Sequence, residues 1–255
     1  MIRIFLGNVG SGKTISIIKE MVDNIEDETS PHYFSNIVTT NKGEHAIPKN
    51  IMITRDMIIK EEVVKVKQNG DEVKSLKFNV EQWLQFKKKY NEFNVVIDEA
   101  HTLMDSRNFM SKQNRVLNDF LSLIRKICNN PVSECNLTLI SQIDSRLDIN
   151  ARKLCTEVRY HINVYDKRCL KCGAVWVEHS ELSDFQKHKK CPRCKGKPLK
   201  FNSRLIVHYF DNIENYEKWK YNQVKTILQT KKISNIDRYY KFYDTFQLDN
   251  LISED

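Results

Sequence analysis

The sequence predicts an α/β domain with a mainly parallel central sheet and a small four-cysteine insertion between two late strands. Three observations support this class. A short apolar strand at residues 2–6 (IRIFL) leads through a glycine-rich loop into a helix. Apolar strands then alternate with segments of helical periodicity, which is typical of a parallel, doubly wound sheet. Two Cys-x-x-Cys pairs lie together in one late connection.

The composition is that of a globular protein with a basic surface. The 255 residues are 40% hydrophobic and 29% charged, enough for one α/β domain and a small appendage. The net charge of +8 favours a polyanionic partner such as DNA or RNA, although it can also simply keep a surface solvated. No apolar run of about 18 residues occurs, so we expect no membrane span. The sequence begins directly with the predicted strand at 2–6 and the glycine-rich loop. This leaves no room for a secretion signal, so we expect a cytoplasmic protein.

Residues 7–14 (GNVGSGKT) fit G-x-x-x-x-G-K-[ST], the phosphate-binding loop. Its glycines let backbone N–H groups turn toward phosphate oxygens, and the following helix points its N-terminus at the anion. The Lys13 ammonium is expected to reach the β- and γ-phosphates, and the Thr14 hydroxyl to ligate Mg²⁺. The residues expected to bind ATP here are Gly7, Asn8, Val9, Gly10, Ser11, Gly12, Lys13 and Thr14.

The middle of the chain alternates between strand and helix signals. Asn79 can cap a helix that runs to Tyr90, and apolar residues recur at helical spacing between 111 and 127. The expected strands are 35–41, 52–54, 95–97 and 136–142. These elements predict successive strand–helix units of one parallel sheet.

A hairpin interrupts this alternation. Residues 62–67 and 72–78 flank Asn69-Gly70, a strong two-residue turn signal. Their alternating Val and Lys predict one face on the protein body and one in water. We interpret residues 60–78 as an insertion, either a plain solvated hairpin or a wing that contacts DNA.

The last third contains the insertion and completes the domain. We expect strands at 158–164 and 203–209, a helix at 216–230 and an aromatic, basic tail at 239–245. The predicted domains are a core at 1–165, a ribbon at 166–200 and a segment at 201–255 that completes the core.

Two acids follow the strand at 95–97. Ligands of parallel α/β sheets bind at the carboxyl ends of strands, so Asp98 is expected in the Mg²⁺ shell. Glu99 is placed to act as general base on a water, which predicts hydrolysis of ATP as well as binding. The alternative is two solvated carboxylates. His101 completes Asp-Glu-Ala-His, similar to superfamily 2 helicases, but a single phosphate loop cannot supply their two motor domains; we expect His101 only to neighbour the site.

Polar residues further along are candidates for sensing the reaction. Gln142 ends the strand at 136–142 and can hydrogen-bond the γ-phosphate or the attacking water, or be a satisfied loop amide. An arginine from a neighbouring subunit often meets the charge that develops on the γ-phosphate. Arg125, Arg146 and Arg152 are the candidates, and each singly could instead be a surface or ion-pair arginine.

The four paired cysteines predict a structural zinc site. Cys169, Cys172, Cys191 and Cys194 form two Cys-x-x-Cys pairs with eighteen residues between them. Four thiolates close a tetrahedral shell and leave no open position for catalysis. A redox pair is the alternative, but it does not explain two matched pairs. Cys128, Cys135 and Cys155 lack such spacing and are expected to be buried thiols.

The ribbon is strongly basic. Residues 166–200 hold ten Lys or Arg and four Asp or Glu, a net charge of +6. The ribbon can therefore contact nucleic-acid phosphates, and a role in docking a protein is nearly as well supported. The residues expected at the phosphates are Lys187, Lys189, Lys190, Arg193 and Lys195.

Taken in order, these motifs resemble those of a known group. GNVGSGKT is followed by VVIDEAH, by LISQ at a strand end, by Arg159-Tyr160-His161, and by YKFYDT at 240–245. This set resembles the Zot-type branch of the HerA/FtsK ATPases, which includes filamentous-phage assembly proteins and viral genome-packaging ATPases. The resemblance covers nearly the whole chain except the hairpin and the ribbon.

The resemblance implies a RecA-like P-loop NTPase core, a hexameric ring and ATP-driven movement of double-stranded DNA. It carries Lys13, Thr14, Asp98 and Glu99 over as the hydrolytic set and Gln142 as the γ-phosphate sensor. Arg125 lies near the group's Arg-His pair, from which Lys126 departs. The phage assembly members carry a membrane helix that this sequence lacks. That favours the packaging motor of a virus or mobile element, acting with a capsid or portal protein in the host cytoplasm or on the virion.

Two other functions remain open. One is a P-loop ATPase that assembles, remodels or exports protein, with the ribbon docking its partner. The other is a nucleotide-dependent DNA-binding protein with little turnover. A small-molecule kinase fits poorly, because Glu99 suits activation of water and no arginine-rich lid is evident.

Overall fold

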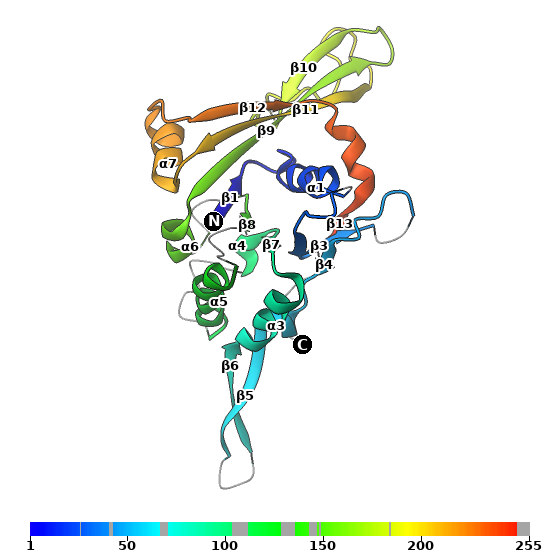
Figure 1. The fold of residues 1–255 in the computed structure, drawn as a ribbon. Coiled ribbons are helices and arrows are strands. Elements are labelled where there is room, and N and C mark those ends of the chain that lie inside the picture. The colour runs from blue at the N-terminus through cyan, green and yellow to red at the C-terminus, as the bar shows by residue number, and fades with distance from the viewer. Residues whose placement is uncertain are drawn as a thin grey trace.

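The computed structural model describes residues 1–25, 27–40, 43–66, 71–103, 112–128, 136–142, 147, 149–183 and 185–248. They form a mixed α/β fold around one nine-stranded sheet with the order β12-β11-β9-β1-β8-β7-β2-β4, with β10 paired to β9 (Figure 1). The strands are β1 (Ile2–Leu6), β2 (His32–Ser35), β4 (Asn50–Met52), β7 (Phe93–Ile97), β8 (Leu137–Ile140), β9 (Glu157–Cys169), β10 (Val175–His179), β11 (Pro198–Phe210) and β12 (Gln229–Ile233). The predicted fold class is confirmed.

The centre of the sheet is parallel. Every neighbouring pair from β9 through β4 runs in the same direction, whereas β10, β11 and β12 are antiparallel to their neighbours. Strand β8 pairs with both β1 and β7, so the strand before the glycine loop and the strand before the acids are not adjacent. The carboxyl ends of β1, β8, β7 and β2 consequently meet at one edge of the sheet.

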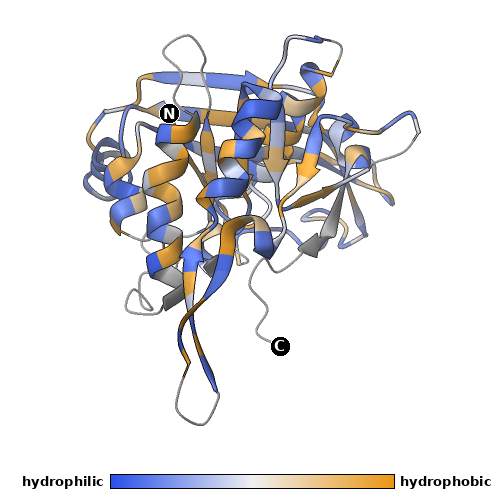
Figure 2. Ribbon diagram, turned by 60° about the horizontal axis from the view of Figure 1, so that its bottom comes forward, coloured by the Kyte–Doolittle hydropathy of each residue, from blue (hydrophilic) through white to orange (hydrophobic). Residues whose placement is uncertain are grey.

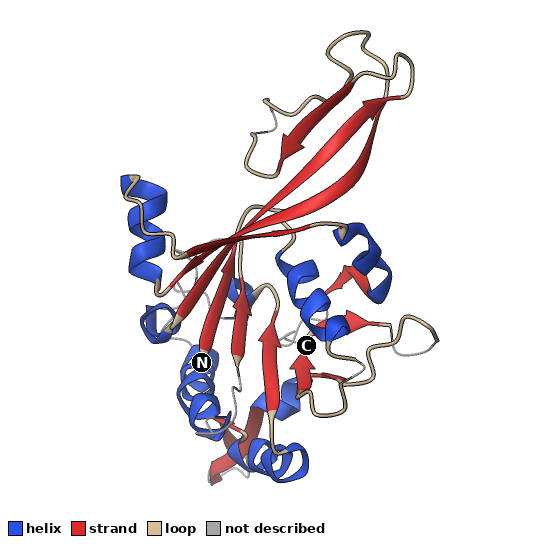
Figure 3. Ribbon diagram, turned by 45° about the horizontal axis from the view of Figure 1, so that its top comes forward, coloured by secondary structure: helices blue, strands red, loops and turns tan. Residues whose placement is uncertain are grey.

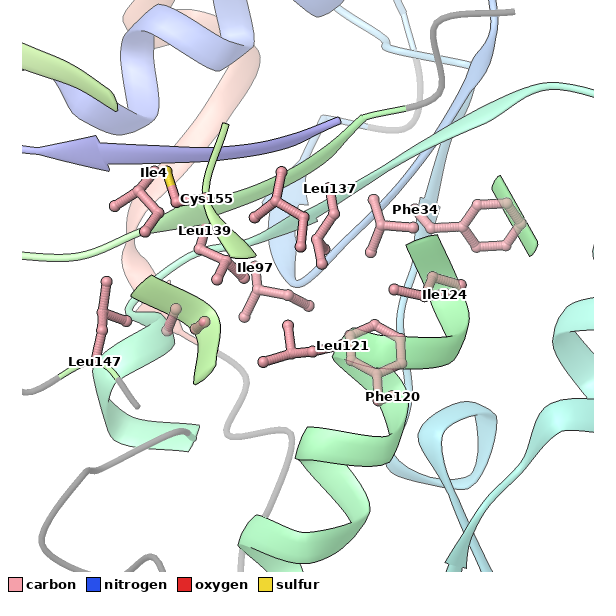
Figure 4. Packing of buried hydrophobic residues seen from close by; sticks show 14 of the residues in the cluster. Ile4, Phe34, Ile97, Phe120, Leu121, Ile124, Leu137, Leu139, Leu147 and Cys155 are labelled. Carbon is pink, nitrogen blue, oxygen red and sulfur yellow. The ribbon is translucent and has the colours of Figure 1, made fainter. Parts of the chain in front are cut away.

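Helices and turns cover both faces of this sheet. They are α1 (Lys13–Asp23), α2 (Arg55–Ile58), α3 (Val80–Tyr90), α4 (Ala100–Leu103), α5 (Lys112–Cys128), α6 (Ile149–Leu154), α7 (Ile213–Asn222) and the 3₁₀ helix η3 (Ile236–Phe242). Successive side chains of a strand point to opposite faces. Ile4 therefore belongs to the core that also holds Phe120 and Leu121 of α5, where its side chain lies beside Cys155 (Figure 4), while Phe5 belongs to a second core with Ile18 of α1. Burial on both faces explains why the central strands β1, β7 and β8 are mainly apolar.

The predicted cap and the predicted hairpin are both present. The Asn79 side chain accepts a hydrogen bond from the Gln82 backbone N–H at 3.4 Å, at the start of α3. Strands β5 (Ile59–Val66) and β6 (Glu72–Phe78) form a separate antiparallel ribbon that extends from the body (Figures 1 and 2). The Asn69-Gly70 turn lies outside the described residues.

The predicted helix at 216–230 is wrong beyond Asn222. Gln223 adopts a left-handed conformation (φ 57°) that ends α7, and its N–H bonds the Lys218 carbonyl. Residues 229–233 instead form β12, which pairs along β11. An open sheet edge offers backbone partners, and such tertiary pairing overrides local periodicity.

The second predicted strand, at 35–41, is divided. Its first residue, Ser35, ends β2 of the main sheet, which begins earlier than predicted at His32, and residues 37–39 form β3 (Ile37–Thr39), which pairs with the C-terminal strand β13 (Tyr243–Leu248). Asn36 separates the two strands because its side chain bonds the backbone at Asp98. The aromatic tail is thereby attached to the body beside α1.

The cysteine ribbon shares its strands with the core. Both β9 and β11 continue well past the sheet into the ribbon, where β10 joins them (Figure 3). The predicted boundary at 165/166 therefore falls inside β9. Across the described segments, no helix combines the length and apolarity that a membrane crossing requires.

Candidate functional site

The glycine loop lies between β1 and α1 and packs tightly on β9 and β11. Gly7 (φ +143°) and Gly12 (φ +90°) adopt backbone conformations that other residues rarely take. A Cβ at Gly7 would lie 2.5 Å from the His161 carbonyl oxygen, and one at Gly12 would lie 2.3 Å from a Leu205 methyl. These contacts explain why the motif needs glycine at both positions, and they leave a backbone cradle at the start of α1.

The two side chains that end the motif are held in place. Lys13 Nζ donates hydrogen bonds to the Gly7 and Asn8 carbonyls at 2.8 and 3.1 Å. Burial lowers the Lys13 pKa, and the nearby acids Glu99 and Asp98 oppose that shift. The Thr14 hydroxyl donates to Asp98 Oδ2 at 2.7 Å. Hydroxyl and carboxylate oxygens are ligands that Mg²⁺ accepts, so this pair fits a magnesium ion beside bound phosphates.

Asp98 is fixed by a residue that the sequence analysis did not identify. Asn36 Oδ1 accepts a hydrogen bond from the Asp98 N–H at 2.7 Å, and Asn36 Nδ2 donates to the Asp98 carbonyl at 3.0 Å. Burial raises the pKa of the Asp98 carboxyl, while the bond from Thr14 opposes that rise. Asn36 is one of several polar residues in the predicted strand at 35–41, so the sequence did not set it apart.

Glu99 contacts both neighbours that the sequence placed near it. Gln142 Nε2 donates to Glu99 Oε1 at 2.7 Å, and His101 Nδ1 lies 3.3 Å from Glu99 Oε2. The backbone of Glu99 is left-handed (φ +50°), a conformation that costs about 1–3 kcal/mol and is often kept at functional sites. Because β8 lies between β1 and β7, Gln142 projects between the loop and the acids.

These groups line one cavity of about 240 Å³. Its walls are the glycine loop with the first turn of α1, then Glu99 and Gln142, and finally Tyr240 and Tyr243 from the tail. The tyrosines were missed because they reach the loop through the packing of η3 on α1 and the pairing of β13 with β3. Two larger cavities, of about 390 and 480 Å³, include Glu92 at the amino end of β7 and do not include the loop. The smaller cavity is therefore the candidate nucleotide site, because it alone of these three is lined by the glycine loop and Glu99.

Strand β9 contacts the glycine loop through side-chain hydrogen bonds. Asn163 Nδ2 donates to the Gly10 carbonyl at 3.2 Å, and Asn8 Nδ2 donates to the Ser180 carbonyl at 3.4 Å. Asn163 and Ser180 are themselves joined, because the Ser180 N–H donates to the Asn163 carbonyl at 2.8 Å. Burial beside Lys13 lowers the His161 pKa to about 3, so a neutral imidazole lies beneath the loop.

Of the three candidate arginines, the structure describes the side chain of Arg152 alone. Arg125 belongs to α5, but its side chain lies outside the description, and Arg146 lies outside the described residues. Arg152 pairs with Glu217 at 3.5 Å on α6, which leads into the amino end of β9 and so faces the opposite edge of the sheet. Among the described residues that line the cavity, none is an arginine.

The four ribbon cysteines come together as predicted. The sulfur atoms of Cys169, Cys172, Cys191 and Cys194 all lie within 4.8 Å of one another. A tetrahedral zinc with Zn–S bonds of about 2.3 Å requires sulfur separations of about 3.8 Å. The Cys169–Cys194 and Cys172–Cys191 separations are 3.4 and 3.7 Å, so the cluster could hold zinc.

The remaining cysteines are described only in part. Cys155 is a buried free thiol as expected, with its pKa raised to about 12 by burial. The Cys128 side chain and the whole of Cys135 lie outside the description.

A glycine cradle after the first strand, with acids two strands away on a parallel sheet, defines an α/β domain of the P-loop kind. Solved structures similar to this chain include the N-terminal domain of zonular occludens toxin from Neisseria meningitidis (TM-score 0.47, 15% identity, 95% of this chain and 98% of that chain). The genome packaging NTPase of Sulfolobus turreted icosahedral virus 2 with ATPγS is also similar (TM-score 0.38, 17% identity, 62% and 74%). No protein-family model and no curated protein matches the sequence.

Proposed function

We propose that this protein is an ATP-driven DNA translocase, the genome-packaging ATPase of a virus or mobile element. The observation that carries the proposal is that one cavity is lined by the glycine cradle, by Thr14, whose hydroxyl bonds Asp98, and by the Glu99–Gln142 pair. Each feature has a distinct task in splitting a phosphoanhydride.

Binding is assigned to the loop. Backbone N–H groups of residues 7–14 and the N-terminus of α1 would surround the phosphates, and Lys13 would neutralise their charge. Thr14 and Asp98 would hold Mg²⁺, which would neutralise charge on the phosphate oxygens. Because Lys13 and Asp98 are both buried, these interactions are screened less than they would be in water.

Hydrolysis is assigned to Glu99. Its carboxylate would accept a proton from a water whose oxygen bonds to the γ-phosphorus, while the bond to the β–γ bridging oxygen breaks and ADP leaves. Gln142 and His101 contact the two carboxylate oxygens and fix the direction of the base. In this proposal Gln142 would also sense the γ-phosphate, since its amide bonds the base that faces it.

DNA binding is assigned to the basic zinc ribbon at residues 166–200. Lys189, Lys190, Arg193 and Lys195 are exposed there, and phosphate contacts supply most non-specific affinity for DNA. We divide the chain into an ATPase core of residues 1–165 and 201–255 and a zinc ribbon of residues 166–200. The proposal includes a hexameric ring in which Arg125 of a neighbouring subunit reaches the γ-phosphate, a capsid or portal partner, and action in the host cytoplasm.

The test measures phosphate release with and without double-stranded DNA. We expect DNA to stimulate hydrolysis, and the double variant Lys189→Glu/Lys190→Glu to lose the stimulation while keeping the basal rate. Lys225→Glu/Lys232→Glu makes the same charge change on exposed lysines outside the ribbon and should respond like wild type. Hydrolysis that ignores DNA at every salt concentration would contradict the DNA assignment.

An apolar face of the ribbon favours a second candidate, an assembly or export ATPase that acts on protein. Val175 of β10 and Leu199 of β11 both lie opposite Arg168 of β9, so they share one face, and both are more than half exposed. Exposed apolar clusters are typical of protein interfaces. Stimulation of hydrolysis by a protein partner, and not by DNA, would favour this reading.

A further inference from the structure

The C-terminal tail is fixed against the phosphate loop. Ile236 and Tyr239 are buried in the core that contains Ile15 and Ile18 of α1, and the Tyr239 hydroxyl donates to Asp23 at 3.2 Å. The Thr40 N–H donates to the Phe242 carbonyl at 2.9 Å. The backbone at 239–243 is therefore held on both sides, by the first helix and by β3.

Two aromatic rings of this tail line the cavity. Tyr240 and Tyr243 are nearly parallel, with an interplanar angle of 26° and ring centroids 6.4 Å apart. Tyr240 is 37% exposed, whereas Tyr243 lies deeper. Burial, with a smaller contribution from Tyr240 and Asp98, raises the pKa of the Tyr243 phenol, so it stays protonated. The accessible ring is consequently that of Tyr240, with Tyr243 behind it.

The cavity walls divide by chemistry. In the proposed function, the loop glycines, Lys13 and Thr14 bind the phosphates and their magnesium ion. Glu99 and Gln142 contact the attacking water. The residues that remain in the cavity walls are Val9, Ile15, Tyr240 and Tyr243, and the Ile15 side chain itself is buried in the core behind the loop. A nucleotide whose phosphates lie in the loop would meet these residues with its nucleoside if it extends along the same cavity. A flat aromatic base fits such walls because aromatic rings prefer offset stacking.

We propose that Tyr240 is the stacking platform for the nucleobase, supported from behind by Tyr243, and that the site accepts adenine and guanine nucleoside triphosphates with little discrimination. Stacking tolerates any base because every base has a π-face. Strong discrimination requires directed hydrogen bonds. Among the described residues of these walls, the polar side-chain groups are two phenol hydroxyls, each of which can donate or accept. This inference rests on the proposed function, since it requires phosphates in the loop.

The test compares ligands with and without a base. The imido analogues of ATP and GTP, and inorganic tripolyphosphate, are titrated calorimetrically with Mg²⁺ into the full chain. The variants are Tyr240→Ala and Tyr240→Phe, with Tyr221→Ala as a matched control on an exposed tyrosine of α7. Alanine substitution of a stacking ring weakens binding by about 5-fold to about 150-fold.

We expect Tyr240→Ala to weaken the binding of both nucleotide analogues by that factor and to leave the affinity for tripolyphosphate unchanged. Tyr240→Phe and Tyr221→Ala should bind all three ligands with affinities close to those of the wild type. Wild-type affinities for the two analogues should agree within about fivefold. Unchanged nucleotide affinity in Tyr240→Ala, or an equal loss for tripolyphosphate, would overturn the platform while leaving the loop assignment intact. A wild-type protein that binds neither nucleotide nor tripolyphosphate would overturn the proposed function itself.

Discussion

The side-chain amide of Asn163 donates a 3.2 Å hydrogen bond to the carbonyl oxygen of Gly10. Asn163 belongs to β9, the strand that ends at Cys169 of the cysteine cluster. Its backbone is also joined to Ser180, which accepts a bond from Asn8 of the loop. One continuous strand thus connects the proposed zinc centre to the proposed phosphate site.

Substitution of this amide should loosen the loop. A hydrogen bond contributes about 0.5–1.5 kcal/mol, so Asn163→Ala is expected to weaken binding of the ATP imido analogue by about 2-fold to about 12-fold. Calorimetric titration measures the change. Asn222→Ala, at the exposed end of α7, should bind like wild type. Equal affinity in the wild type and Asn163→Ala would show that the amide does not position the loop.

Glu99 can be tested by removing its charge alone. Glu99→Gln keeps the shape but cannot accept the proton, and loss of a general base slows reactions by about 10²- to 10⁴-fold. Single-turnover phosphate release should fall by that factor while affinity for the ATP analogue stays within about twofold. Glu72→Gln, an exposed acid of β6, is the control. A normal rate in Glu99→Gln would remove this residue from the mechanism.

His161 should make the stability depend on pH. Burial lowers its pKa to about 3, whereas an unfolded histidine titrates near 6.5. Below about pH 6.5 the unfolded chain binds a proton that the folded chain does not, so stability falls as pH falls through this window. From pH 7 to pH 5 the loss is about 2 kcal/mol.

Urea unfolding at pH 7 and pH 5 measures this loss. His161→Phe retains a ring against Phe5 and should show a smaller difference between the two pH values. His188→Gln changes an exposed histidine and should behave like wild type. If wild type and His161→Phe lose stability equally, the buried imidazole is not the cause.

The cysteine cluster predicts one zinc ion per chain. Cys191→Ser removes a buried ligand and should abolish zinc in elemental analysis of the purified protein. Structural zinc contributes folding energy directly, so trypsin should then cut within residues 166–200. Cys155→Ala alters a buried thiol outside the cluster and should keep its zinc. Full-length protein that contains no zinc yet resists trypsin would refute the assignment.

Local chemistry predicted much of the site. The cradle needs a fixed spacing of glycines and Lys13, the acids follow directly on an apolar strand, and two Cys-x-x-Cys pairs are readable without a fold. The sequence did not predict the residues that hold these groups in place. Asn36 lies between two strands and Asn163 within one, and as polar residues they stand out only once the fold brings Asp98 and the loop beside them.

The sequence by itself determined the α/β class, the phosphate loop, the acid pair and the cysteine cluster, because each depends on residues close together in the chain. Tertiary structure alone decided that β8 lies between β1 and β7, that residues 229–233 form a strand where a helix was expected, and that Tyr240 reaches the cavity. The physical reason is that these outcomes depend on backbone pairing and burial between segments far apart in sequence, which local periodicity does not encode.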